Sequence, residues 1–168
     1  LFDYDVVSKT FERNIQSPAQ VKRLIEGLQK QTPTPLLIAV DQEGGKVNRL
    51  KTKYGFPKSV TAKYLGDLNN VDSTAYYALR NAQTLKELGF NVNFAPVVDI
   101  DLNPINPVIG KYERSYADNS EIVVRHATTW IKAQQDYGIL STLKHFPGHG
   151  SSDADSHEGV TDITKHWQ

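Results

Sequence analysis

Three short apolar segments recur along the chain, and a charged residue closes each of them. Residues 36–40, 92–99 and 139–143 have the length and composition of β-strands; Asp41 and Lys144 follow the first and third, and Asp99 ends the second. Segments with helical periodicity lie between them, which is the order of repeated βαβ units. Because crossovers between parallel strands are right-handed, the three strand exits lie on one edge of the sheet. We therefore expect an α/β chain with a parallel sheet, either doubly wound or a (β/α)8 barrel.

Three helices are expected, each with a recognisable start or end. Ser17 is the predicted N-cap of the first, with Pro18 in its first turn and Gln20 at the capping-box position. Ser73 and Ser120 are the predicted N-caps of the other two, and a glycine ends each of those helices. The expected apolar faces share helical spacing: Val21, Leu24, Ile25 and Leu28; Ala75, Ala78, Leu79, Ala82, Leu85 and Leu88; Val123, Val124, Ala127, Trp130 and Ile131.

The remaining segments have their own expected structure. Residues 1–4 resemble a strand, and residues 51–72 are expected to be irregular. The unbroken apolar run at 36–40 suits a strand covered on both faces. Pro96 lacks a backbone donor, so it belongs near a strand end or at a bulge. His126 lies between core positions and is expected to be structural or exposed.

Residues 144–157 concentrate polar chemistry. One lysine, three histidines and two aspartates occupy these fourteen positions, together with two glycines and a proline that exclude a regular helix. Asp155 and His157 are close enough for a carboxylate–imidazole hydrogen bond if the loop curls, and such a bond prepares a histidine for general acid/base catalysis. A polar surface loop with incidental histidines is one alternative. Another is a divalent-metal site with the ligands His145, His149, Asp155 and His157.

Four blocks of the sequence resemble the glycoside hydrolase family 3 β-N-acetylglucosaminidases. The first is KHFPGHG at residues 144–150, followed by Asp-Ser-His at 155–157. The others are DQEGGKVNRL at 41–50, NFAPVVD at 93–99, and the pair NPVIG and RSY within 106–116. The resemblance runs nearly from end to end and implies the (β/α)8 barrel. Because such barrels typically need ~250 residues, the single domain formed by residues 1–168 is expected to be an incomplete barrel.

The resemblance also implies roles for particular residues. His157 would be the catalytic acid/base, and Asp155 would orient it and balance its charge. Four residues would hold the sugar: Asp41, Arg114, Lys144 and His145. The family needs no metal and no cofactor, and its nucleophilic aspartate lies on a later strand that no position of this chain matches.

Four further charged residues are expected to have structural roles. Glu43 and Arg49 are expected to pair within the loop after the first strand. Asp99 and Asp101 are expected to shape loops.

The function implied is that of a retaining exo-β-N-acetylglucosaminidase acting on peptidoglycan-derived fragments. The partner would be a saccharide or muropeptide containing N-acetylglucosamine. A catalytically incomplete carbohydrate-binding domain is the first alternative, and a metal-dependent hydrolase using the histidine loop is the second.

Composition excludes several other classes. Lys plus Arg and Asp plus Glu number 19 each, so the basic excess of a nucleic-acid binder is missing. The absence of cysteine excludes disulfides, thiolate catalysis and cysteine zinc sites. No apolar run is long enough for a membrane span, and a cytoplasmic location is expected. The chain contains no methionine and starts at Leu1, so we expect a piece of a longer protein, of undetermined oligomeric state.

Overall fold

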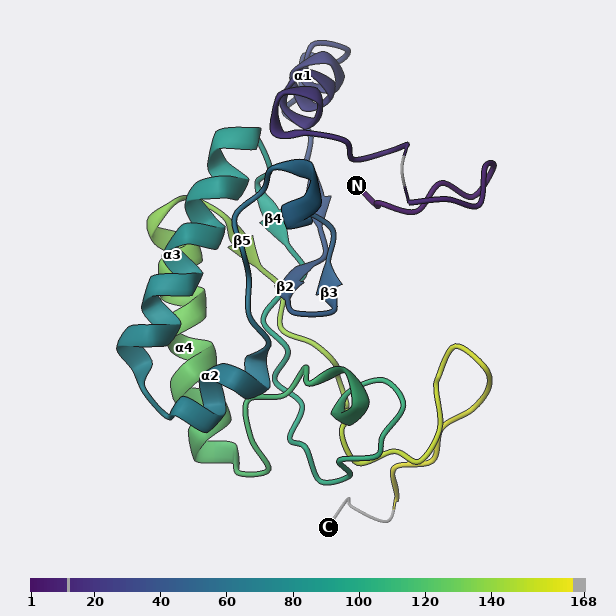
Figure 1. The fold of residues 1–168 in the computed structure, drawn as a ribbon, viewed down its shortest axis with the longest axis vertical. Coiled ribbons are helices and arrows are strands. Elements are labelled where there is room, and N and C mark those ends of the chain that lie inside the picture. Colours follow the sequence, from purple (N-terminus) through teal and green to yellow (C-terminus); the bar gives the residue numbers. More distant parts are fainter. Residues whose placement is uncertain (12, 165–168) are drawn as a thin grey trace.

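Three parallel strands form a sheet at the centre of the structure (Figure 1). They are β1 (Ala39–Val40), β4 (Val92–Asn93) and β5 (Leu140–Ser141), with β4 between the other two. Ala39 pairs with Val92, and Val92 pairs with Leu140, so the strands align at their first residues. The computed structural model describes residues 1–11 and 13–164. For this part of the chain, the prediction of an α/β fold with a parallel sheet is confirmed.

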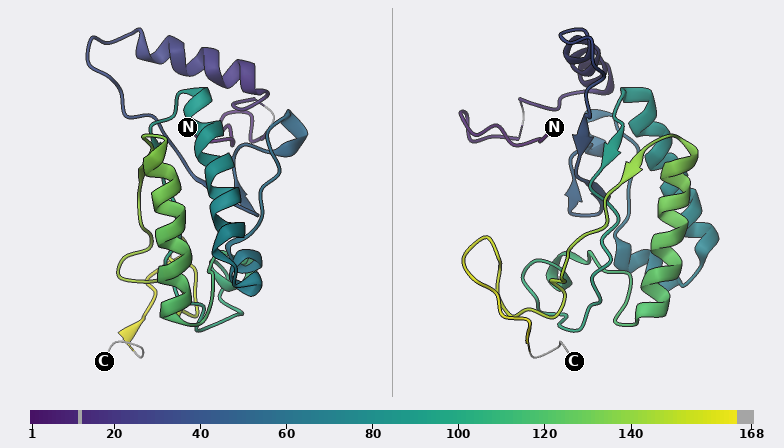
Figure 2. Two further views of the ribbon diagram at one scale, coloured as in Figure 1. Left: turned by 90° about the vertical axis from the view of Figure 1, so that its left-hand side faces the viewer. Right: turned by 180° about the vertical axis from the view of Figure 1, so that it is seen from behind.

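The strands are shorter than the apolar segments that predicted them, and helices cover one face of the sheet. The helices α3 (Val71–Leu88) and α4 (Ser120–Asp136) lie side by side against that face in both views of Figure 2. Ile38 and Val40 are buried, whereas the side chain of Leu37 is 74% exposed. The expectation that residues 36–40 are covered on both faces is therefore wrong, because the side chain of Leu37 is open to solvent.

Strand pairing resumes past the end of β4. Val97 forms a parallel bridge with Lys144, and Val98 N donates to Lys144 O at 2.7 Å. Pro96 lies between the two paired stretches, and its carbonyl accepts from Lys144 N at 3.3 Å. Pro96 thus follows the strand, as predicted, and the renewed pairing holds Asp99 and Lys144 at the same edge.

The first helix, α1 (Pro18–Gln29), begins as the sequence predicts. Ser17 Oγ accepts from Gln20 N at 3.2 Å, and Gln20 Oε1 reaches back to Gln16 N at 3.1 Å. Val21 and Ile25 are fully buried, while Leu24 and Leu28, also expected in the core, are more than a third exposed. The buried stripe is thus narrower than predicted.

The two central helices are capped by asparagines. Asn70 Oδ1 accepts from Ser73 N at 2.9 Å, and Asn119 Oδ1 accepts from Ile122 N at 3.2 Å. The predicted caps at Ser73 and Ser120 are wrong, because asparagine is an equally good N-cap and precedes each serine.

Two residues predicted for the helical core lie outside it. The side chain of Leu79 is 39% exposed and that of Val124 is 63% exposed. The contact between α3 and α4 instead includes a polar pair, in which Thr74 Oγ1 lies 2.7 Å from His126 Nδ1 and both residues are fully buried. His126 is therefore structural, one of the two outcomes expected for it.

Two other segments depart from prediction. Residues 51–72 contain the helix α2 (Ala62–Leu68), capped by Thr61, as well as the 3-10 turn η1 (Thr52–Tyr54) and the first residues of α3. Residues 1–4 form no strand; the described amino-terminal segment has only an isolated bridge between Asp5 and Thr10.

A two-stranded hairpin follows β1 directly. It consists of β2 (Gln42–Gly44) and β3 (Val47–Asn48), which pair antiparallel. A second 3-10 turn, η2 (Gly110–Tyr112), lies in the long connection between β4 and α4. None of the helices in the described ranges is both long and apolar enough to cross a membrane.

Candidate active site

Residues at the carboxyl edge of the sheet form one charged cluster. Asp41 directly follows β1, and Glu43 lies in β2. Lys144 Nζ lies 2.5 Å from Asp41 Oδ1 and 2.5 Å from Glu43 Oε1. Arg114 bonds Glu43 and also lies in contact with His145. We call these five residues the rim cluster: Asp41, Glu43, Arg114, Lys144 and His145. The structure thus brings together all four residues that the sequence predicted to hold a sugar.

Arg114 reaches the rim cluster from the loop after η2. Its Nε lies 2.8 Å from Glu43 Oε2, and one terminal nitrogen lies 2.7 Å from Glu43 Oε1, so the pairing is bidentate. The other terminal nitrogen donates to Val108 O at 3.2 Å. Burial alone would lower the pKa of Arg114, but Glu43 outweighs it and raises that pKa, so the guanidinium stays charged.

The contacts of His145 determine its tautomer. Its Nε2 lies 3.2 Å from a terminal nitrogen of Arg114, which can only donate, so Nε2 accepts. The proton of the neutral ring is then on Nδ1, which lies 2.5 Å from Asp99 Oδ2. The ring of His145 is therefore held between a guanidinium and a carboxylate.

Asp99 supports the loop as well as the imidazole. Its carboxylate accepts from His145 N at 3.2 Å and from His149 N at 2.5 Å. Burial acts to raise the pKa of Asp99, but the bonds from His145 and His149 outweigh burial and hold that pKa below its usual value. Asp101 differs, since its Oδ1 is buried without a hydrogen-bond partner among the described residues and burial raises its pKa.

The pairing expected within the loop after β1 is wrong for Glu43. Arg49 bonds Asp41 Oδ2 at 3.0 Å, whereas Glu43 points away to Arg114 and Lys144. Alternate residues of an extended chain point to the same side, so Asp41 and Glu43 face Lys144 together. The separation of two residues between Asp41 and Glu43 is the sequence signal that could have predicted Glu43 in the site. Burial would raise the pKa of Asp41, but Lys144 and Arg49 hold it below its usual value.

The backbone conformation and a close neighbour both require a glycine after Glu43. Gly44 has φ of 106°, a conformation that favours glycine. A Cβ at this position would lie 2.4 Å from Val60 O. The group that approaches Gly44 closely is thus the backbone of residue 60.

A cleft of about 420 Å³ opens beside the rim cluster. Asp99, Lys144 and His145 form part of its wall, and Phe146, whose side chain is 93% exposed, lies at its edge. The volume lies within the ordinary range for sites that bind small molecules.

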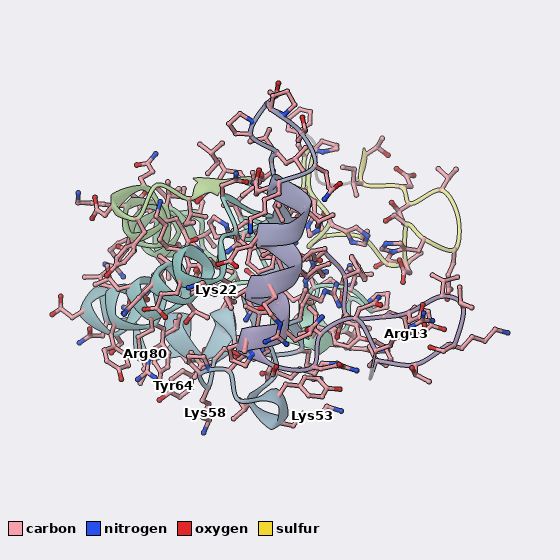
Figure 3. All side chains as sticks on the ribbon, turned by 90° about the horizontal axis from the view of Figure 1, so that it is seen from above. Arg13, Lys22, Lys53, Lys58, Tyr64 and Arg80 are labelled. Carbon is pink, nitrogen blue, oxygen red and sulfur yellow. The ribbon has the colours of Figure 1, made fainter. Side chains whose placement is uncertain are left out.

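Asp155 and His157 form their predicted hydrogen bond on a separate, exposed loop. Asp155 Oδ1 lies 2.7 Å from His157 Nδ1 and accepts from His157 N at 2.9 Å. These contacts hold the pKa of Asp155 below its usual value. The side chain of His157 is 82% exposed, and the loop stands out at one side of the molecule (Figures 1 and 3). Within the described ranges, no hydrogen bond or ion pair joins Asp155 or His157 to the rim cluster.

His149 is committed to the loop that contains it. Its Nδ1 lies 3.0 Å from Ser152 Oγ, and its Nε2 lies 3.2 Å from Ser156 Oγ. Across residues 1–11 and 13–164, no three histidine or acidic side chains are grouped so that they could hold a metal ion. The structure therefore does not assemble the four metal ligands considered above.

Comparison with known proteins identifies the family of the chain. The family model described as the glycosyl hydrolase family 3 N terminal domain matches residues 4–167, so the chain belongs to that family. "Beta-hexosaminidase A" of Pseudoalteromonas piscicida is 40% identical over 165 residues, which cover 89% of this chain and 26% of that protein.

Two solved structures are similar as well. A glycoside hydrolase family 3 beta-N-acetylglucosaminidase from Paenibacillus sp. str. FPU-7 has a TM-score of 0.84 at 41% identity, over 89% of this chain and 28% of that one. NagZ from Neisseria gonorrhoeae in complex with N-trifluoroacetyl-D-glucosamine has a TM-score of 0.81 at 32% identity, over 89% of this chain and 45% of that one. The chain thus spans between about a quarter and under half of the length of these relatives.

Proposed function

We propose that this chain carries the sugar-binding and acid/base parts of a retaining exo-β-N-acetylglucosaminidase. Its substrates would be peptidoglycan-derived saccharides or muropeptides that end in N-acetylglucosamine. The observation that carries the proposal is the rim cluster beside a cleft of sufficient size, with a hydrogen-bonded Asp155–His157 pair on a neighbouring loop. The names of the similar proteins, one of them solved with an N-acyl glucosamine, support this substrate class.

The fold proposed for the whole protein is a (β/α)8 barrel. Residues 1–168 would form one domain that contributes consecutive βα units to it. The parallel order β1-β4-β5 and the position of the site at the carboxyl edge support this proposal, because barrel enzymes place their chemistry there.

The rim cluster would bind the sugar ring before any bond breaks. Asp41 can accept hydrogen bonds from hydroxyl groups, while Lys144 and Arg114 can donate them. Every charge in the cluster already has an opposite partner, and this suits a neutral ligand rather than an anion. Asp99 and Arg114 fix the ring of His145, so that this contact would need no reorganisation on binding.

The chemical step would use Asp155 and His157 together with an aspartate that the family resemblance places further along the protein. That aspartate attacks C1, the glycosidic C1–O bond breaks, and the leaving oxygen takes the proton of His157 Nε2. In the second step water attacks C1 and gives a proton to His157 Nε2, while the bond between C1 and the aspartate breaks and frees the carboxylate. Asp155, bonded to Nδ1, keeps Nε2 directed outward throughout. The loop of residues 151–164 must bring His157 towards the rim cluster for this step.

The test is hydrolysis of a chromogenic β-N-acetylglucosaminide by the full-length protein, with EDTA present. We expect turnover by the parent and a loss of roughly 10²- to 10⁴-fold in kcat for His157→Ala, the usual effect of removing a general acid/base. Asp155→Asn should lower kcat less, because the imidazole remains.

Three other outcomes would redirect the proposal. A full-length protein that binds N-acetylglucosamine without turnover would be a carbohydrate-binding module. Activity abolished by EDTA alone would indicate a metal-dependent hydrolase. Full activity of His157→Ala would remove that residue from catalysis.

A further inference from the structure

Gln42 separates the two acids of the rim cluster, and its backbone is bonded on both sides by one buried side chain. Asn93 Oδ1 accepts from Gln42 N at 3.1 Å, and Asn93 Nδ2 donates to Gln42 O at 3.2 Å. Asn93 lies in β4 and is fully buried. A single amide therefore fixes the two peptide units from which the side chains of Asp41 and Glu43 diverge.

The side chain of Gln42 is fixed as firmly as its backbone. It is 4% exposed, and its Oε1 accepts from Arg49 N at 2.9 Å and Leu50 N at 3.1 Å. Its Nε2 donates to Asn48 Oδ1 at 2.6 Å. Because Gln42 points into the protein, the residues on either side of it point to the opposite face, where Lys144 lies.

The amide of Asn93 is in turn held by the two central helices. Asn93 Nδ2 lies 3.4 Å from Asn81 Oδ1 of α3, and that oxygen also accepts from Gln134 Nε2 of α4 at 3.2 Å. Asn81 Nδ2 donates to Gln42 O at 3.4 Å. A continuous row of side-chain amides thus runs from α4 through α3 and β4 to the peptide between the acids.

We propose that Asn93 is a positioning residue of this site, which sets the directions of Asp41 and Glu43 towards Lys144. Lys144 Nζ is equidistant from the two carboxylates, at 2.5 Å from each, and this bridge fails if the peptide of Gln42 rotates. Displacement of a site residue by about 1 Å can cost roughly 10²-fold in rate. The consequence for activity rests on the proposed function, whereas the consequence for the carboxylates does not.

The chain provides a matched control in Asn91. Its Oδ1 accepts from Ile38 N at 2.7 Å, and its Nδ2 donates to Leu36 O at 2.8 Å. Asn91 therefore makes a comparable pair of backbone bonds, to two residues just before β1, at the opposite end from the rim cluster. Asn93→Ala and Asn91→Ala each remove one such amide, but only Asn93 bonds the residue between Asp41 and Glu43. An effect on stability should therefore be common to both variants, whereas an effect on positioning should be confined to Asn93→Ala.

The experiment compares these two variants in the full-length protein by kcat/KM on a chromogenic β-N-acetylglucosaminide and by thermal melting. We expect Asn93→Ala to lose at least 10-fold in kcat/KM, while Asn91→Ala lowers Tm comparably and stays within about 2-fold of the parent. Equal kcat/KM for the two variants would overturn the proposal.

A second readout is independent of activity. Carboxyl ¹³C NMR follows the titration of Asp41, whose charged neighbours are Lys144 and Arg49. In Asn93→Ala the pKa of Asp41 should rise as the contact with Lys144 is lost, and in Asn91→Ala it should not change. An unchanged Asp41 titration in Asn93→Ala would also overturn the proposal.

If Asn93→Ala does not fold, Asn81→Ala replaces it; this variant removes one bond to Gln42 O and should give a smaller loss in the same direction, and no loss would overturn the proposal. If the parent does not hydrolyse the substrate, the proposed function fails, while the Asp41 titration still decides the role of Asn93.

Discussion

The rim cluster and the Asp155–His157 pair contain similar groups but are built in different ways. The rim cluster draws residues from three distant parts of the chain and buries most of their surface. The pair is made by residues two apart, and the side chain of His157 is 82% exposed. The rim cluster is thus assembled by the fold, whereas the Asp155–His157 pair needs only its own loop. We therefore expect changes in the rim cluster to have the larger effect on stability, and changes in the Asp155–His157 pair to affect catalysis with little effect on stability.

The largest expected effect on stability comes from Glu43→Ala. The variant removes the anion that bonds Arg114 and Lys144, and it leaves two cations with little access to water. Breaking a buried ion pair from one side costs about 3 kcal/mol or more of unfolding free energy. Urea denaturation should show this loss, and Asp155→Ala should lower the urea midpoint far less, because the contact that it removes is exposed. Equal midpoints for Glu43→Ala and the parent would mean that the rim cluster is no more stabilising than the exposed pair.

A smaller effect is expected in acid. The pKa of Asp99 lies below its unfolded value of ~3.9, so the unfolded chain binds more protons as pH falls. The contribution of Asp99 is present above that value and is lost as pH falls through the lower, folded pKa. Urea midpoints measured from pH 6 to pH 2.5 should therefore fall less steeply for Asp99→Asn than for the parent.

Salt should separate Asp99 from Asp155 in the same experiment. The pKa of Asp155 is lowered too, but through an exposed contact with His157. Salt screens exposed charges more than buried ones, so at 1 M NaCl the effect of Asp155→Asn on the acid slope should shrink more than that of Asp99→Asn. Loss of both effects would show that Asp99 is as open to solvent as Asp155.

The smallest expected effect comes from a buried histidine, His126. Burial lowers the pKa of His126 from its usual ~6.5, so the unfolded chain binds a proton there first as pH falls. The stability that neutral His126 contributes is present above pH ~6.5 and is lost as pH falls through the folded pKa. The ring of His126 stacks on that of Tyr116, with 5.4 Å between the centroids, and His126→Phe keeps a ring in that place. Because phenylalanine does not titrate, the variant should show a smaller change in urea midpoint between pH 7 and pH 5. A change for His126→Phe as steep as that of the parent would contradict the burial of His126.

The parts of the fold that could be predicted are those encoded by local spacing. The three apolar segments predicted the places and directions of β1, β4 and β5, because a parallel order follows from the helices between them. The hydrogen bond between Asp155 and His157 followed from a separation of two residues. Ser17 as a helix cap followed from the same kind of short-range pattern.

The parts that could not be predicted depend on contacts distant in sequence. Glu43 was expected to stay within its own loop, but its partner Arg114 is 71 residues away. Leu79 was expected in the core from its spacing, yet α3 turns Thr74 towards His126 instead. The role of Asn93 has no local signature at all, because its two bonds end on a residue 51 positions earlier. In each case tertiary packing selects one of several faces that the local pattern permits.

The order of the sheet has a consequence for how the chain could fold during synthesis. β1, β4 and β5 lie side by side in the order in which they are translated, so each strand pairs with one that is already made. Protein domains fold from the amino terminus as they emerge, at ~5–20 residues per second. A growing chain can therefore extend this sheet at a single advancing edge, without reopening a pair formed earlier. The rim cluster would close last, when Lys144 emerges to meet Asp41 and Glu43.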